Sequence, residues 1–159
     1  MSLQFSPDEV LELARRLEQQ AASFYRDAAM TCSNPEAKEL FLDLADMEMR
    51  HEQVFDALRD DAHRDPDHWP RQAGKAHWQA VADIMLGKLQ GDLGKRFDGK
   101  CSYHAILHEA MDFEKDTLVF FVAMKEMLRP GTPQESIDGI IRDEMGHLIE
   151  LGSRLAGGK

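Results

Sequence analysis

The chain has 159 residues, a length typical of one domain with a hydrophobic core. Its net charge of −10 argues against nucleic acid, which needs a basic surface, and against an anionic membrane surface. No stretch approaches the roughly 20 apolar residues that span a bilayer, and no signal peptide is visible. We therefore expect a cytoplasmic protein with a single domain over residues 1–159.

Two helices joined by a short turn are predicted in the first part of the chain. An N-cap serine and a first-turn proline start a helix over about 7–30, in which apolar residues recur with helical spacing. An Asn-Pro pair starts a second helix over about 35–60. We expect this helix to end near Asp60, where its apolar stripe fades.

A long connection and a second pair of helices follow. Residues 61–76 are rich in Asp, His, Pro and Gly, and the whole stretch 61–101 is predicted to form a crossover, with one shorter helix at 77–90. Two further helices are expected at about 102–128 and 133–156, the last with Glu135 placed for a capping box. Strand signals are nearly absent, so we predict an all-α fold: a four-helix bundle of two antiparallel hairpins with one long crossover.

Six acidic or imidazole side chains interrupt the apolar faces of these helices. Carboxylates are rarely buried unless they are paired or bound to a metal. Their position on core faces therefore marks a candidate metal site. The six residues are Glu18, Glu48, His51, Glu114, Glu144 and His147.

Two Glu-x-x-His motifs, Glu48 to His51 and Glu144 to His147, belong to this set. Residues three apart on a helix project from the same side, so both side chains of a motif can reach one ion. The composition predicts fewer than one such match by chance. A solvated helix face would explain one match, but two matches on core faces favour a site.

The helical hairpins bring these residues level with one another. Glu18 and Glu48 lie 15 residues on either side of Ser33, near the first turn, and Glu114 and Glu144 are likewise 30 residues apart. The second half of the site thus repeats the first with an offset of 96 residues. A pseudo-twofold bundle around two metal ions requires such a repeat.

Ligand chemistry indicates the metal. Four carboxylates balance two divalent ions, and oxygen ligands with one imidazole per ion suit iron or manganese. In known di-metal bundles, one Glu from each of two helices and a Glu-x-x-His from each of the other two project inward. We expect two iron ions, with manganese or a mixed pair as the alternative.

The sequence resembles the rubrerythrin-like branch of the ferritin-like superfamily. The segments that carry the resemblance are 17–29, 44–55, 113–121 and 140–151. The resemblance implies a ferritin-like bundle in which all six residues are metal ligands. It further implies that Glu48 and Glu144 bridge the ions, that Glu18 and Glu114 are more terminal, and that the protein is a homodimer.

Two departures from the family pattern affect the predicted activity. Full-length rubrerythrins carry a rubredoxin domain with two CxxC motifs, whereas this sequence has only Cys32 and Cys101, which we expect to be reduced thiols. A separate protein is therefore the expected electron donor. Peroxide-reducing rubrerythrins also have a further Glu one turn after the third-helix ligand, and Thr117 stands there in this chain.

Three other residues have open roles. Tyr25 lies seven residues after Glu18 on the same face, where it could donate a hydrogen bond to a ligand or to bound oxygen, or be a core tyrosine. His104 and His108 are one helical turn apart, where they could bind a metal or have a surface or core role.

The leading functional prediction is a di-iron redox protein that reacts with peroxide or oxygen. The first alternative is a ferroxidase or iron-handling protein, for which ferrous iron is the substrate. The others are a non-enzymatic helical module with a structural metal site, and a hydroxylase of an organic substrate.

Overall fold

The computed structural model describes residues 6–68, 83, 102–128 and 130–157. Within this part of the chain the secondary structure is helical. The elements are α1 (Pro7–Thr31), α2 (Pro35–Arg64), the 3-10 turn η1 (Pro66–His68), α4 (Tyr103–Met127) and α5 (Thr132–Gly157). The four long helices were all predicted, whereas the expected helix at 77–90 lies, apart from Asp83, outside the described residues.

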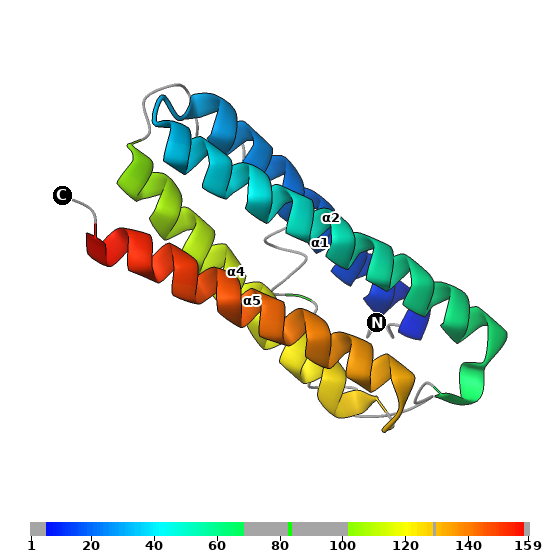
Figure 1. The fold of residues 1–159 in the computed structure, drawn as a ribbon. Helices are drawn as coiled ribbons and strands as arrows, with labels where there is room; N and C mark the ends of the chain where they lie inside the picture. The colour runs from blue at the N-terminus through cyan, green and yellow to red at the C-terminus, as the bar shows by residue number, and fades with distance from the viewer. Residues whose placement is uncertain (1–5, 69–82, 84–101, 129, 158–159) are drawn as a thin grey trace.

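The helices form a bundle of two antiparallel hairpins (Figure 1). α1 pairs with α2, and α4 pairs with α5; across the bundle, α1 lies beside α4 and α2 lies beside α5. The colours of Figure 1 show that these neighbours also run in opposite directions. Moving the bounds of α1 by the offset of 96 residues gives the bounds of α4, so the repeat in the sequence is a repeat in the fold.

Capping residues set where three of the helices begin. Ser6 and Glu9 form a reciprocal capping box at α1, and Ser102 accepts a hydrogen bond from the Ala105 N–H at α4. The capping box expected for Glu135 does not form in the described structure. Its N–H donates instead to the carbonyl of Gly131 (3.0 Å), a residue whose positive φ of 144° turns the chain into α5.

The second helix is longer than predicted. α2 continues to Arg64 because Ala62 is buried and extends the apolar face by one more turn. The Asp65 N–H still donates to the carbonyl of Asp61 (2.8 Å), and the Arg64 guanidinium donates to the carbonyl of Asp60. The two consecutive aspartates therefore do not end the helix.

Aromatic residues fill the core around its polar centre. Tyr25 stacks on Phe41 with ring centroids 6.1 Å apart, and Phe55 packs on Phe121 at 5.2 Å. Buried aromatic rings of this kind exclude water and hold the helices at a fixed spacing. Among the described residues, no helix combines the length and apolar character needed to cross a lipid bilayer.

The N-cap of α2 gives a first testable expectation. Asn34 accepts hydrogen bonds from the N–H groups of Glu36 (2.8 Å) and Ala37 (3.3 Å). Asn34→Ala should lower the free energy of unfolding by about 1 kcal/mol, because two N–H groups lose their acceptor. Urea denaturation measures the change, with the exposed neighbour Ser33→Ala as the control. Equal losses in the two variants would contradict the capping role.

Candidate metal centre

The six side chains singled out in the sequence meet at the centre of the bundle. Each of the four long helices contributes at least one of them, and each is between 1% and 5% exposed. α1 contributes Glu18, α2 contributes Glu48 and His51, α4 contributes Glu114, and α5 contributes Glu144 and His147. Such a concentration of carboxylates in a water-excluded core requires compensating positive charge or bound protons.

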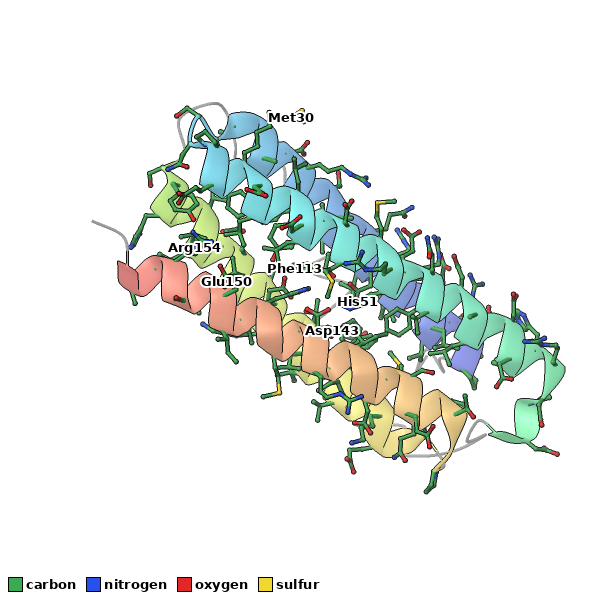
Figure 2. All side chains as sticks on the ribbon, in the orientation of Figure 1. Met30, His51, Phe113, Asp143, Glu150 and Arg154 are labelled. Atoms are coloured by element: carbon green, nitrogen blue, oxygen red, sulfur yellow. The ribbon has the colours of Figure 1, made fainter. Side chains whose placement is uncertain are left out.

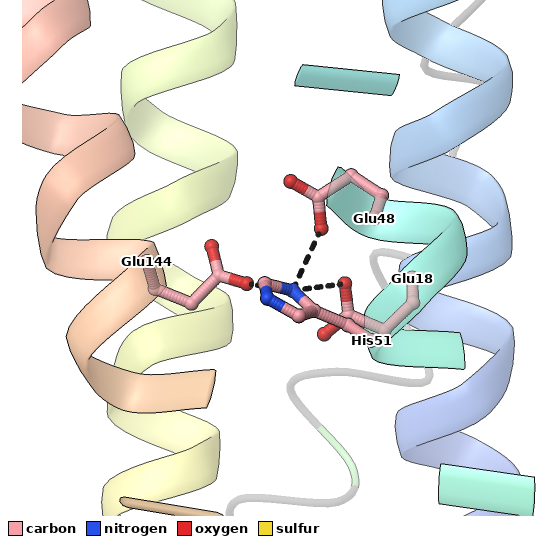
Figure 3. A group of neighbouring side chains, drawn as sticks. All are labelled: Glu18, Glu48, His51 and Glu144. Atoms are coloured by element: carbon pink, nitrogen blue, oxygen red, sulfur yellow. Dashed lines mark ion pairs between the residues drawn. The ribbon is translucent and has the colours of Figure 1, made fainter. Parts of the chain in front are cut away.

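The first of two groups surrounds His51 (Figure 3). Its Nδ1 lies 2.9 Å from Glu144 Oε1, 3.5 Å from Glu48 Oε2 and 3.6 Å from Glu18 Oε2. The ring stands between Glu144 on α5 and the two glutamates of the first hairpin, so one group joins three helices.

The second group surrounds His147 in the same manner. Its Nδ1 lies 3.0 Å from Glu48 Oε1, 3.3 Å from Glu144 Oε2 and 3.5 Å from Glu114 Oε1. In each group the potential ligand atoms lie within 4.8 Å of one another. Glu48 and Glu144 belong to both groups, so their carboxylates lie between two cation positions.

The side chains present fit a pair of metal ions. Several buried atoms of the site have no hydrogen-bond partner of suitable geometry within the described structure. They are Glu18 Oε1, Glu48 Oε1, both oxygens of Glu144, His51 Nδ1 and both nitrogens of His147. Buried polar atoms are rarely left in this state, and coordination to an ion would satisfy the oxygens and the Nδ1 atoms together. Oxygen ligands with one imidazole for each position suit iron or manganese.

Without metal, the two histidines carry the positive charge of the site. Burial by itself would lower the pKa of His147, but Glu114, Glu144 and Glu48 raise it to about 12. Burial also opposes protonation of His51, and the three glutamates of its own group raise its pKa far above the usual range. Each imidazolium thus occupies the place of a cation.

The four glutamates divide into two pairs. Burial raises the pKa of Glu18 well above its usual range, and it raises the pKa of Glu114 to about 8. Burial acts in the same direction on Glu48 and Glu144, but contacts with the histidines and the partner glutamates outweigh it and lower their pKa. At neutral pH the metal-free site therefore holds two imidazolium ions, two carboxylates and two protonated carboxylic acids, with no net charge.

Tyr25 and Thr117 both contact Glu114. Tyr25, fully buried, donates the hydrogen bond of its hydroxyl to Glu114 Oε1, and burial raises its pKa well above 10. Thr117 is also buried, but its hydroxyl donates to the backbone carbonyl of Glu114 (3.0 Å). Tyr25 thus positions the Glu114 carboxyl group, whereas Thr117 satisfies its own hydroxyl within the helix.

Sequence reasoning missed Asp143. The Nε2–H of His51 donates to Asp143 Oδ2 (3.2 Å), and Figure 2 shows the two residues close together between α2 and α5. A carboxylate on the outer nitrogen of a metal-binding histidine fixes its tautomer and orients its ring. Asp143 immediately precedes the second Glu-x-x-His motif, but a surface aspartate at that position carried no signal without the packing of α5 against α2.

The remaining candidates lie away from the centre. His104 and His108 are exposed, and their rings contact each other edge to face at 4.5 Å. Neither belongs to a potential metal group within the described residues. Cys32 is a half-buried free thiol whose pKa is raised by burial, and Cys101 lies outside the described residues.

Comparisons with known proteins agree with this architecture. The model of the rubrerythrin family matches residues 9–152. Among solved structures, the chain is similar to a Thermotoga maritima protein proposed to be a ferritin-like diiron-carboxylate protein, with a TM-score of 0.73, 22% identity and 98% coverage of each chain. At this identity the likeness establishes the fold alone, and that fold is the predicted ferritin-like four-helix bundle. No curated protein matches significantly. Because the family match spans nearly the whole chain, the protein belongs to the rubrerythrin family.

Proposed function

We propose that this chain is a di-iron redox protein that reacts with peroxide or oxygen at the centre of its bundle. The observation that carries the proposal is the pair of buried groups that share Glu48 and Glu144 and contain one imidazole each. A fixed pair of adjacent, oxygen-rich sites suits two redox-active ions. When bound there, iron would supply the electrons for reduction of the small oxidant.

The chain's own residues would hold and shield this chemistry. Glu48 and Glu144 would bridge the two positions, Glu18 and Glu114 would each serve one position, and the Nδ1 atoms of the histidines would complete the two sets. The Tyr25 hydroxyl would hold a proton at Glu114 Oε1, beside the ligand set, as a proton source for the reduction. The surrounding aromatic residues would keep bulk water away from the reduced site.

An iron-handling role is the second candidate, and one observation favours it. A cavity of about 370 Å³ between α2 and α5 reaches His147 and is lined by acidic side chains, among them Glu39 and Asp43. The lining also contains Arg154, but its acids outnumber this basic group, and a cleft with an excess of one charge raises the local concentration of ions of the opposite charge. Ferrous iron would then be a substrate that enters, is oxidised and leaves.

Two partners belong to the proposal. The sequence contains no CxxC motif, so an electron donor outside this sequence would reduce the site. Association into a homodimer is the second expectation.

Elemental analysis of protein expressed with iron tests the proposal. We expect about two iron ions for each chain and loss of both in a Glu48→Ala, Glu144→Ala variant, because these residues belong to both groups. The control is a Glu126→Ala, Glu135→Ala variant, which removes two exposed glutamates and should keep its iron. Protein without metal under iron-replete, reducing conditions would favour the helical-module alternative.

Rapid mixing of the reduced, iron-loaded protein with peroxide then separates the two redox roles. A fixed cofactor predicts oxidation of the site with both ions retained, and repeated turnover when reductant is supplied. An iron-handling protein predicts release of ferric iron after each turnover.

A further inference from the structure

The two halves of the centre have equivalent ligands but different surroundings. The offset of 96 residues maps Glu18, Glu48 and His51 onto Glu114, Glu144 and His147. Three features next to these ligands do not follow the offset. The first and the third favour firm binding at the half that contains His51 and exchange at the half that contains His147.

The first feature is the outer nitrogen of each histidine. His51 Nε2 donates to Asp143 Oδ2 at 3.2 Å, although Asp143 is half-exposed. The offset places Met47 at the corresponding position in the other half, and His147 Nε2 has no partner among the described residues. Loss of such an outer carboxylate typically lowers metal affinity 10- to 100-fold, so the His147 half lacks this contribution.

The second feature is the Tyr25 hydroxyl. It donates to Glu114, the terminal carboxylate of the His147 half. Its counterpart by the offset is Phe121, which has no hydroxyl to offer Glu18. This hydroxyl makes the two halves different but does not by itself rank their affinities for an ion.

The third feature is the cavity between α2 and α5. Of the six proposed ligands, His147 alone lines it, together with Met47 and acidic residues of both helices. His147 is 5% exposed and lines the cavity, while both of its ring nitrogens are buried. Within the described structure Arg154 pairs with two of the four lining acids, Glu150 (2.9 Å) and Glu36 (4.0 Å), and no ion pair engages the other two, Glu39 and Asp43.

We propose that the His51 half holds its divalent cation tightly, and that the His147 half exchanges its cation with solution through the cavity between α2 and α5. This inference rests on the proposed two-metal function and assigns different roles to its two positions. One cation would be resident, and the other would be the one that enters and leaves.

Calorimetric titration of metal-free protein with Co²⁺ tests whether the His51 half binds its cation more tightly than the His147 half. We expect two binding constants that differ by at least tenfold. Asp143→Asn should weaken the tighter constant 10- to 100-fold and narrow the gap, while Glu135→Gln, an exposed acid on the same helix, should change neither constant.

A gain-of-function variant tests the same point from the other half. Met47→Asp should strengthen the weaker constant, because it supplies a carboxylate at the position equivalent to Asp143. The Arg50 guanidinium contacts Met47 Sδ and would form an ion pair with the new carboxylate. Met47→Asp is therefore combined with Arg50→Ala in one double variant, and Arg50→Ala alone is the control. Circular dichroism verifies the helical content of each variant.

The rate of Co²⁺ binding tests whether the cavity between α2 and α5 is the entry route. A Glu39→Gln, Asp43→Asn variant should slow the binding of the second Co²⁺ several-fold at low salt and leave the first unchanged, because both acids line the cavity. An unchanged second rate would overturn the cavity as the route.

The outcomes separate this inference from the proposed function. Two equal constants, or an Asp143→Asn variant that weakens only the weaker site, would overturn the inference and leave the two-metal function standing. Wild-type protein that binds no Co²⁺ would overturn both.

Discussion

Metal-free protein is expected to melt well below the metal-loaded protein, and the difference is expected to grow as the pH rises. Metal binds only the folded site, so loading stabilises the native state. Metal removal leaves the two imidazolium ions as the cations of the site. The stability of the metal-free protein then depends on whether they keep their protons.

The sign of the pH dependence follows from the two kinds of raised pKa. The folded state keeps the His147 proton up to about pH 12, whereas the unfolded chain loses it near pH 6.5. The folded state keeps the Glu114 proton up to about pH 8, whereas the unfolded chain loses it near pH 4.5. Between pH 6.5 and 8 the folded state therefore binds more protons, and the stability of the metal-free protein falls as the pH rises.

The expected size follows from the same relation. Each extra proton bound by the folded state lowers stability by about 1.4 kcal/mol per pH unit, or roughly 3–6 °C in melting temperature for a chain of this size. Metal displaces these protons, so metal affinity rises with pH. The difference in stability between the metal-loaded and the metal-free protein therefore grows as the pH rises.

Calorimetry of both forms at pH 6, 7 and 8 measures the effect. A gap in melting temperature that widens with pH agrees with the expectation. The Glu48→Ala, Glu144→Ala variant is the control and should melt at one temperature with or without metal. Equal melting temperatures for the wild-type forms, after verified metal removal, would contradict the prediction.

The helices and the polar cluster could be predicted from sequence because both depend on local spacing. The apolar stripes and the start signals at Ser6 and Asn34 determine the helices, and two helices of similar length joined by a short turn must bring Glu18 level with Glu48. The convergence of all six side chains required only that each hairpin fold on itself and bury its apolar face.

The features that sequence could not give depend on how one hairpin lies against the other. The contact between His51 and Asp143 joins residues 92 positions apart, across the α2–α5 boundary. The cavity near His147 forms at the same boundary, from side chains that are individually ordinary surface acids. Neither the contact nor the cavity is marked by a periodic pattern in the sequence, because each arises from packing between helices.

Two of the buried glutamates have a raised pKa and two have a lowered pKa. Replacement by glutamine is therefore predicted to change the free energy of unfolding in opposite directions in the two pairs. In the metal-free protein at pH 8, Glu114→Gln is expected to raise the free energy of unfolding by on the order of 2 kcal/mol. Burial raises the pKa of Glu114 to about 8, so its folding requires a proton that the unfolded chain gives up at this pH. The neutral amide removes this cost and still offers an oxygen to the Tyr25 hydroxyl.

Glu48→Gln is expected to have the opposite sign. A hydrogen bond with Glu18 and contacts with both histidines hold the pKa of Glu48 below its usual range. The oxygens of Glu48 lie 3.0 Å from His147 Nδ1 and 3.5 Å from His51 Nδ1. Loss of its charge leaves two buried imidazolium ions with less compensation, which should lower stability by about 3 kcal/mol. Both variants should lose metal capacity, so their opposite signs would appear only in metal-free protein.

Urea denaturation of the two metal-free variants at pH 8 and pH 5 tests this division. At pH 5 the gain from Glu114→Gln should largely vanish, because pH 5 is close to the pKa of 4.5 in the unfolded chain and protonating the carboxyl group on folding then costs little. The loss from Glu48→Gln should remain, because Glu48 stays ionised in the folded wild type at that pH. Destabilisation of similar size by both variants at pH 8 would mean that the four glutamates share their protons evenly. The metal-free site would then be a single delocalised cluster rather than two acids beside two ion pairs.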